Sequence, residues 1–258
     1  METVISLNQI GLYNPQRQSA EVTEALFVAR QKQFEWLLNK IVKEQKNSIP
    51  QHYIIIGQRG MGKTMLLKRM EVELHKEQYR NRFIPLLFPE EQYNIKDLAI
   101  FWSNCLDALA DSLESEDKEK YNTQIADIDK TIRVLSKKAP ENISEEAFHF
   151  LMSTCSALQR RPVLLIDNIG LVFSRLRDNS NNKGQWALRK ILSENGAPIF
   201  VSAGPTVTDD VINYDMPFYD FFHIQYTDGD AEIYLKNRAI EISEPARMII
   251  EKMRRYMD

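Results

Sequence analysis

The stretch that decides the fold is Gly57-Gln58-Arg59-Gly60-Met61-Gly62-Lys63-Thr64, which reads G-x-x-x-x-G-K-T. It follows the β-branched run 53–56, which predicts a buried strand, and precedes residues 65–70, which predict the start of a helix. Glycines let a backbone turn with positive φ and approach an anion closely, while the loop amides and the helix N-terminus face that anion. The pattern in this context therefore predicts a phosphate-binding loop.

Two side chains give the loop its expected chemistry. The Lys63 ammonium is expected to reach the β and γ phosphates of ATP, and the Thr64 hydroxyl is expected to ligate Mg²⁺. ATP and Mg²⁺ are therefore the predicted cofactors. The residues expected to contact the nucleotide are Gly57, Gln58, Arg59, Gly60, Met61, Gly62, Lys63, Thr64 and Met65.

A second stretch supplies the carboxylate that such a loop needs. Residues 160–166 predict a buried strand, and Asp167 follows at its carboxyl end. A carboxylate there can hold the water shell of Mg²⁺ opposite Thr64. Thr64 and Asp167 are thus the predicted metal residues, and Lys63 and Asp167 are also predicted to take part in catalysis.

Composition limits the class of protein. A chain of 258 residues, 43% hydrophobic and 27% charged, predicts one large soluble domain, alone or with a small appendage. The net charge of −3 argues weakly against nucleic acid as an obligate partner, so DNA has no support from charge. Cys105 and Cys155 are too few for a disulfide framework and indicate a reducing cytoplasm. No apolar run approaches membrane-spanning length, so no membrane partner is expected.

The other segments alternate between helix and strand, which predicts an α/β fold: a three-layer, mostly parallel sheet with helices on both faces. Pro85 favours an edge position for its strand. The expected elements are an amphipathic helix over 26–41, strands over 83–88, 198–202 and 221–226, a helix capped by Asn94, a solvated helical excursion over 111–140, a helix capped by Ser144, and a helix over 186–192. The expected domains are an extended arm over 1–26, a phosphate-loop ATPase domain over 27–227, and the start of a helical lid over 228–258, short enough to suggest a fragment of a longer protein.

The chain resembles the AAA+ and STAND-type ATPases, and looks most like prokaryotic ATPases related to origin-recognition and signalling ATPases. The resemblance spans about residues 26–240, and four stretches carry it: Phe27-Val28-Ala29-Arg30, Gly57 to Thr64, Leu164 to Asn168, and Ile199 to Ser202. It implies that another strand lies between the two motif strands, and that Ser202 acts as a polar sensor.

The chain departs from the family pattern at two places that bear on hydrolysis. These families usually place a glutamate after the magnesium aspartate, but here Asn168 follows, and an amide orients a water without taking its proton. Glu90 and Glu91, after the strand expected to neighbour the Asp167 strand, are the candidate replacements; slow hydrolysis is the alternative. Residues 191–235 contain no lysine or arginine where the family's arginine finger lies, which leaves Arg175, Arg177 and Arg189 as candidates.

Three functions fit these residues. The first is a slow ATPase that acts as a nucleotide-dependent switch on a macromolecular partner, which Asn168 favours. The second is an active AAA+ ATPase that remodels or loads a protein or DNA partner. The third is a small-molecule kinase, which would want a basic lid that residues 191–235 do not offer. A second copy of the chain and an unidentified protein are the other partners considered.

Overall fold

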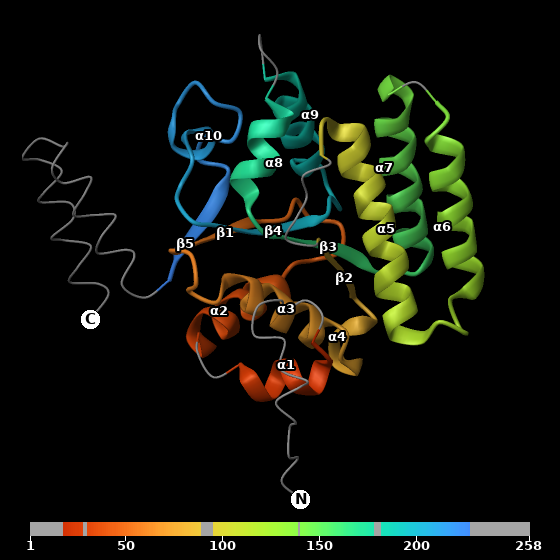
Figure 1. The fold of residues 1–258 in the computed structure, drawn as a ribbon, viewed down its shortest axis with the longest axis horizontal. Helices are drawn as coiled ribbons and strands as arrows, with labels where there is room; N and C mark the ends of the chain where they lie inside the picture. The colour runs from red at the N-terminus through yellow and green to blue at the C-terminus, as the bar shows by residue number, and fades with distance from the viewer. Residues whose placement is uncertain (1–17, 28–29, 89–94, 139, 178–181, 228–258) are drawn as a thin grey trace, which may run out of the picture.

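The computed structural model describes residues 18–27, 30–88, 95–138, 140–177 and 182–227, and these form an α/β fold (Figure 1). The sheet in this part of the chain has five strands: β1 (His52–Ile56), β2 (Phe83–Leu87), β3 (Arg161–Ile166), β4 (Ile199–Gly204) and β5 (Phe222–Tyr226). The strand order is β2-β3-β4-β1-β5, and each neighbouring pair is parallel. The predicted fold class is confirmed.

The strand order confirms two further predictions. Strand β4 lies between β1, which leads into the phosphate loop, and β3, which ends before Asp167. Strand β2 lies at the edge of the sheet, where Pro85 pairs with Val163 on one side. A proline has no N–H to give a second neighbour, which is why the edge accepts it.

Helices cover both faces of the sheet. Those of the described residues are α1 (Ala20–Leu26), α2 (Gln31–Ile41), α3 (Lys63–Leu74), α4 (Glu77–Arg80), α5 (Leu98–Asp117), α6 (Asn122–Leu135), α7 (Pro140–Ala157), α8 (Ile169–Leu176), α9 (Lys183–Leu192) and α10 (Asp209–Ile212). Figure 1 shows α1 to α4 on one face and α8 to α10 on the other, with α5, α6 and α7 grouped beyond β2 and β3. In the described part of the chain, no helix is both long and apolar enough to cross a bilayer.

Alternating side chains divide the core into two apolar clusters, one on each face. Leu164 and Ile166 of β3 pack with α5, α7 and α8, whereas Val163 and Leu165 pack with α2 and α3. Successive strand residues point to opposite faces, so a sheet covered on both sides needs apolar residues at every position. This explains why most of β1, β3 and β4 is apolar in the sequence, over residues 53–56, 162–166 and 199–201.

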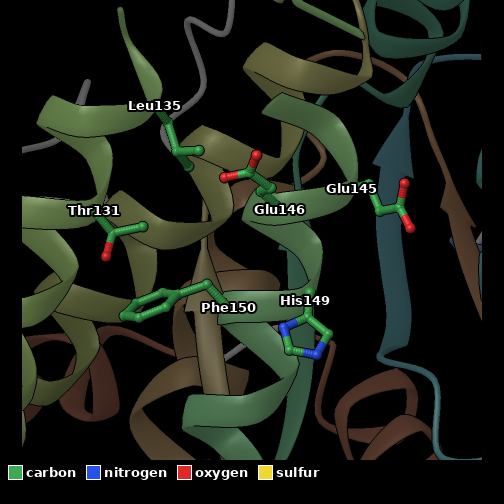
Figure 2. Close-up of a pocket in the computed structure, with 6 residues that line it drawn as sticks. All are labelled: Thr131, Leu135, Glu145, Glu146, His149 and Phe150. Carbon is green, nitrogen blue, oxygen red and sulfur yellow. The ribbon is translucent and has the colours of Figure 1, made fainter. Parts of the chain in front are cut away.

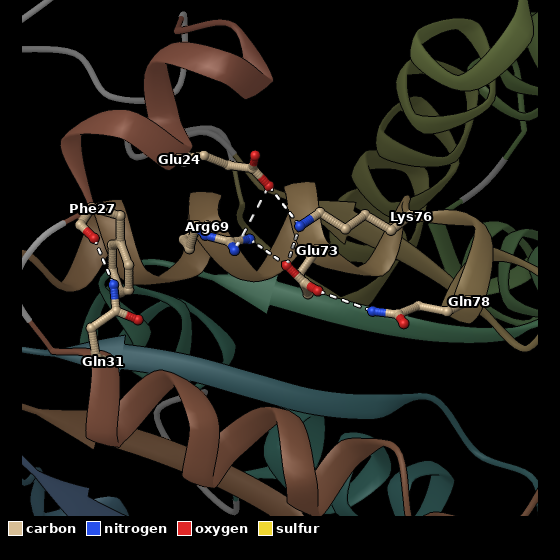
Figure 3. Close-up of polar contacts among 7 residues, drawn as sticks. All are labelled: Glu24, Phe27, Gln31, Arg69, Glu73, Lys76 and Gln78. Carbon is tan, nitrogen blue, oxygen red and sulfur yellow. Dashed lines mark hydrogen bonds and ion pairs between the residues drawn. The ribbon is translucent and has the colours of Figure 1, made fainter. Parts of the chain in front are cut away.

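Helix α1 is fixed to α3, the helix that follows the phosphate loop (Figure 3). Glu24 of α1 pairs with Lys76 at 2.7 Å and with Arg69 at 3.7 Å, and both cations also pair with Glu73. Burial would raise the pKa of Glu73, but hydrogen bonds and charges from Lys76 and Arg69 outweigh it, so the pKa is lowered. The Arg69 guanidinium also lies 4.6 Å from the centre of the Phe34 ring. These contacts pack α1 and α2 against α3.

The expected extended arm over 1–26 is wrong over its last residues. Ser19 caps α1, its hydroxyl accepting a hydrogen bond from the Val22 amide, so residues 20–26 are helical. The helix expected over 26–41 is also wrong at its start, because α2 begins at Gln31 after Arg30, whose φ is 64°. A left-handed residue cannot continue a right-handed helix.

Two expected helix starts are also wrong. Asp97, not Asn94, is the N-cap of α5, since its Oδ1 accepts from the Ile100 amide at 2.9 Å; Asn94 lies outside the described residues. Ser144 lies inside α7, which begins at Pro140. The first turn of a helix leaves amides unpaired, so a proline is well suited to begin one.

The expected excursion over 111–140 is helical but only partly solvated. Helix α5 continues to Asp117, and α6 packs against α5 and α7 through the buried Ile128 and Leu135. The expected lid over 228–258 lies outside the described residues, and the limits of the ATPase domain stay a prediction.

Candidate nucleotide site

The loop 57–64 joins β1 to α3 and turns through two left-handed glycines. Gly60 has φ of 84° and Gly62 has φ of 76°, values that other residues rarely adopt. Space does not demand glycine at position 60, because no atom lies within 4 Å of where its Cβ would stand. Gly62 is the N-cap of α3, so the unpaired amides of a twelve-residue helix begin directly after the loop. This arrangement suits an anion.

Lys63 is buried, with its ammonium held inside the loop. Its Nζ donates to the carbonyl oxygens of Gly57 at 2.6 Å and Gln58 at 2.9 Å. Gln58, Arg59 and Gly60 are exposed, so the outer side of the loop is open to solvent. A phosphate at the loop would bring charge-assisted acceptors to the Lys63 ammonium, which are stronger than neutral carbonyls.

Thr64, in the first turn of α3, contacts Asp167, which follows β3. The Thr64 hydroxyl donates to Oδ2 of Asp167, and Oδ1 accepts from the Asn168 amide at 2.8 Å. Asp167 is only 7% exposed, so these bonds orient both oxygens of a nearly buried carboxylate. Hydroxyl and carboxylate oxygens are the ligands that Mg²⁺ prefers, so the pair fits that ion. Bound there, Mg²⁺ would supply charge neutralisation for phosphate oxygens.

Asn168 occupies a left-handed position between β3 and α8. Its φ is 54° and its ψ is 55°, and its side chain is exposed and makes no cap for α8. Asparagine is enriched in this region of backbone space, whereas longer side chains are strained there. The residue after Asp167 is therefore one that the local backbone favours.

Arg30 belongs to the neighbourhood of the loop, although sequence reasoning did not count it among the site residues. Its Nε donates to the carbonyl of Met61, and the same atom lies 3.9 Å from where a Cβ on Gly62 would stand. Its left-handed backbone turns the chain from α1 toward α2. The signal was present in the Phe27-Val28-Ala29-Arg30 stretch, but its link to the loop needed the tertiary structure.

Ser202 is not brought to the loop. It lies in β4 with no exposure, and its hydroxyl donates to the carbonyl of Tyr53 at 3.4 Å. The neighbours Val201 and Ala203 pack in the cluster on the α3 face. Since strand side chains alternate, Ser202 faces the other side of the sheet, away from Thr64.

Of the three other predicted site residues, the structure describes only Met65. Met65 is partly buried against the apolar cluster around α3, so its side chain packs in the core. Glu90 and Glu91 lie outside the described residues, and only their preceding strand β2 is placed beside β3.

The three arginines considered as fingers differ in their contacts. Arg177 pairs with the buried Asp210 at 2.7 Å. Arg189 donates to the carbonyls of Pro217 and Tyr219. Arg175 is exposed in the last turn of α8, and no ion pair or hydrogen bond engages its side chain within the described residues. Of the three, Arg175 is the one available to another molecule.

A pocket of about 370 Å³ lies between α6 and α7 (Figure 2). Its lining residues are Thr131, Leu135, Glu145, Glu146, His149 and Phe150. Glu146 is already paired with Lys138, at 2.5 and 2.8 Å. None of the predicted site residues lies on these two helices, so the pocket is separate from the loop.

Comparison with known proteins places the chain in a family. The ORC-CDC6-like family model matches residues 8–137, which is half of the chain and includes the phosphate loop. No curated protein matches. Similar solved structures include CDC6P from Pyrobaculum aerophilum, at 15% identity and a TM-score of 0.43, over 80% of this chain and 48% of that one. Another is Drosophila ORC bound to GC-rich DNA and Cdc6, at 7% identity and a TM-score of 0.46, over 88% of this chain and 34% of that one.

The chain thus spans less than half the length of either solved chain. The family model rests on the part of the sequence that carries the loop, and Asp167 lies beyond that part. On that match, the chain belongs to the ORC-CDC6-like family of origin-recognition-related AAA+ ATPases.

Proposed function

We propose that the chain binds ATP and Mg²⁺ at the loop 57–64 and acts as a slow, nucleotide-dependent switch on a macromolecular partner. One observation carries the proposal: Thr64 contacts Asp167 beside the buried Lys63, while the next residue is an asparagine. Lys63, Thr64 and Asp167 provide for binding of ATP and Mg²⁺, whereas the asparagine leaves the site without the usual general base.

Binding rests on groups that are already oriented. The left-handed Gly60 and Gly62 shape the loop, α3 presents its amides, and Lys63 contributes a positive charge. A site organised before its ligand arrives spends little free energy on ordering itself. Thr64 and Asp167 would hold Mg²⁺ at the end of β3, where an oxygen ligand set is assembled.

Slow hydrolysis rests on Asn168. An asparagine amide can orient a water but cannot accept its proton in the usual pH range. General-base help is typically worth about a hundredfold to ten-thousandfold in rate. A protein that binds ATP well and hydrolyses it slowly remains in its bound state for a long time, which suits a switch.

The second candidate is an active AAA+ ATPase that remodels or loads a protein or DNA partner. The exposed Arg175 favours it: no ion pair or hydrogen bond with a described residue engages its side chain, and such an arginine can complete the site of a neighbouring molecule. Membership of the family supports a DNA or protein partner for either function.

The experiment that tests the proposal measures binding and turnover on the same preparation. Calorimetry with ATP and Mg²⁺ gives the affinity, and a single-turnover assay with excess protein gives the rate of hydrolysis. The switch predicts measurable affinity together with turnover below about one per minute, against an enzyme median near 10 per second. Rapid turnover would favour the second candidate, and absence of ATP binding would refute both.

A further inference from the structure

Helix α9 and the segment 213–221, which follows α10, lie on the face of the sheet opposite α3 (Figure 1), and they carry three exposed aromatic side chains. Trp186 of α9 is 50% exposed, Tyr214 is 81% exposed and Tyr219 is 43% exposed. The rings of Tyr214 and Tyr219 lie 5.6 Å apart, edge to face. Single exposed aromatics are common on protein surfaces, but a group of them is typical of interfaces.

The two elements form one continuous surface. Asn182 and Arg189 lie on the same side of α9 as Trp186, at helical spacings of four and three residues. Asn182 contacts the Met216 sulfur at 3.7 Å, and Arg189 donates to the Tyr219 carbonyl at 3.2 Å. Trp186, between these two contacts, therefore adjoins the segment 213–221.

The segment 213–221 is held firmly from beneath. Phe218 is fully buried and stacks on Phe173 of α8, with ring centres 4.5 Å apart. The Tyr219 amide donates to the Met216 carbonyl at 3.1 Å, which closes a turn. Rigid aromatic side chains lose little conformational entropy when they are covered, so this surface is suited to binding.

Charge divides the surface into two halves. Asp215 and Asp220 stand beside the tyrosines, whereas Lys183 and Lys190 lie three and four residues from Trp186 on α9. All four are exposed, and none of them forms an ion pair with another described residue. Asp210, in contrast, is buried and already paired with Arg177. The four exposed charges thus remain available to another molecule.

We propose that this surface, formed by Lys183, Trp186, Lys190, Tyr214, Asp215, Tyr219 and Asp220, binds a second copy of the same surface across a two-fold axis. An isologous interface needs one patch that complements itself, with each residue contacting its counterpart's partner. An acidic tyrosine half beside a basic tryptophan half meets that requirement, because a two-fold rotation sets each half against its opposite. Lysines over tyrosine rings add cation–π attraction. The proposal stands whether or not the loop 57–64 binds ATP.

Charge reversal with rescue tests the proposal. One variant changes the acidic half, Asp215→Lys with Asp220→Asn, the latter chosen because φ at position 220 is 51° and asparagine tolerates it. The other changes the basic half, Lys183→Glu with Lys190→Glu. Sedimentation velocity over a concentration series then compares wild type, each variant alone, and an equal mixture of the two.

The proposal predicts a wild-type dimer that weakens with salt, at least about a tenfold loss of dimer affinity for each variant alone, and recovery in the mixture, because opposite halves meet again. Tyr214→Ser should also weaken the dimer, whereas the matched control Val134→Ser, on the 50% exposed Val134 of α6, should not. Unchanged thermal midpoints would show that the variants fold. A monomeric wild type, a dimer that survives both reversals, or a mixture that stays monomeric would overturn the proposal.

Discussion

The Thr64 hydroxyl donates a hydrogen bond to Oδ2 of Asp167, a residue 103 positions further along the chain. This bond links the first turn of α3 to the residue that follows β3. It does so although β4 lies between β3 and β1, the strand that leads into the loop. The proposed nucleotide site has three separate parts: the loop 57–64, the Asp167 carboxylate and Asn168. Each part can be tested by itself.

The Lys63→Ala substitution should lower ATP affinity by at least about tenfold, a loss of roughly 1.4 kcal/mol or more. The ammonium is expected to make charge-assisted contacts to the phosphates, and the variant loses them. Titration calorimetry measures the change. Lys68→Ala is the matched control, because Lys68 lies on the same helix but pairs with Glu71 at 2.5 Å. Equal affinity in wild type and Lys63→Ala would refute the assignment of the phosphate loop.

The Asp167→Asn substitution should leave the thermal midpoint of the nucleotide-free protein nearly unchanged or slightly raised. The asparagine oxygen can still accept from the Asn168 amide, its Nδ2 can donate to the Thr64 hydroxyl oxygen, and the buried negative charge is removed. The variant should lose the additional stabilisation that Mg²⁺ gives on top of ATP, because a ligand raises the thermal midpoint only if the folded protein binds it. Thermal unfolding with ATP, with and without Mg²⁺, checks this. Asp129→Asn on the exposed side of α6 is the control, and an equal Mg²⁺ shift in Asp167→Asn would place the metal elsewhere.

His52 should make stability depend on pH. Burial lowers its pKa from 6.5 to about 4, and its ring bridges two backbone groups, with Nε2 3.0 Å from the Leu192 carbonyl and Nδ1 accepting from the Phe200 amide at 3.1 Å. Between these pKa values the unfolded chain binds a proton that the folded chain does not. The contribution of neutral His52 to the free energy of unfolding is therefore fully present above pH 6.5. It is lost as the pH drops toward 4, which lowers the free energy of unfolding by up to about 3 kcal/mol.

Urea unfolding at pH 7 and pH 5 measures this dependence. The His52→Gln variant should be less stable at pH 7, because it loses the acceptor for the Phe200 amide, but it should lose less stability between the two values than wild type. His149→Gln, at an exposed position of α7, should behave as wild type does. An identical pH dependence in wild type and His52→Gln would mean that other groups cause it.

The sequence predicted the sheet well because its signals are local and physical. The loop 57–64, the apolar run before Asp167 and the edge position of Pro85 each follow from a few adjacent residues. The helix starts were less predictable, because Asp97 and Asn94 are equally good caps and only packing selects one. Ser144 carried the same ambiguity, and α7 began earlier, at Pro140.

The candidate site was predicted only where its residues lie in local sequence motifs. Thr64 and Asp167 follow from motif context, but the contact of Arg30 with Met61 depends on how α1 and α2 pack beside α3. Ser202 was predicted as a site residue from the strand that contains it. The face of the sheet to which its side chain points, however, depends on its exact position along β4. A shift of one position turns a strand side chain to the opposite face, which a motif match cannot detect.

The Asn168→Glu substitution tests whether the missing carboxylate is what makes hydrolysis slow. It places a carboxylate where related ATPases keep theirs, and its left-handed backbone should cost about 1 kcal/mol of stability because glutamate is strained there. Base and binding groups are separate, so ATP affinity should stay about the same while turnover rises. Asn168→Gln, of similar size but without the charge, is the control for that backbone strain and should remain slow.

The decisive measurement is the single-turnover rate of ATP hydrolysis by wild type and Asn168→Glu, at saturating protein and Mg²⁺. A switch that lacks its base should hydrolyse ATP at a rate below about one per minute, and the variant should be at least about a hundredfold faster, which is the lower range of general-base help. A wild type that already hydrolyses ATP rapidly, and loses that activity on Glu90→Gln or Glu91→Gln, would show that another carboxylate is the base and would contradict the switch.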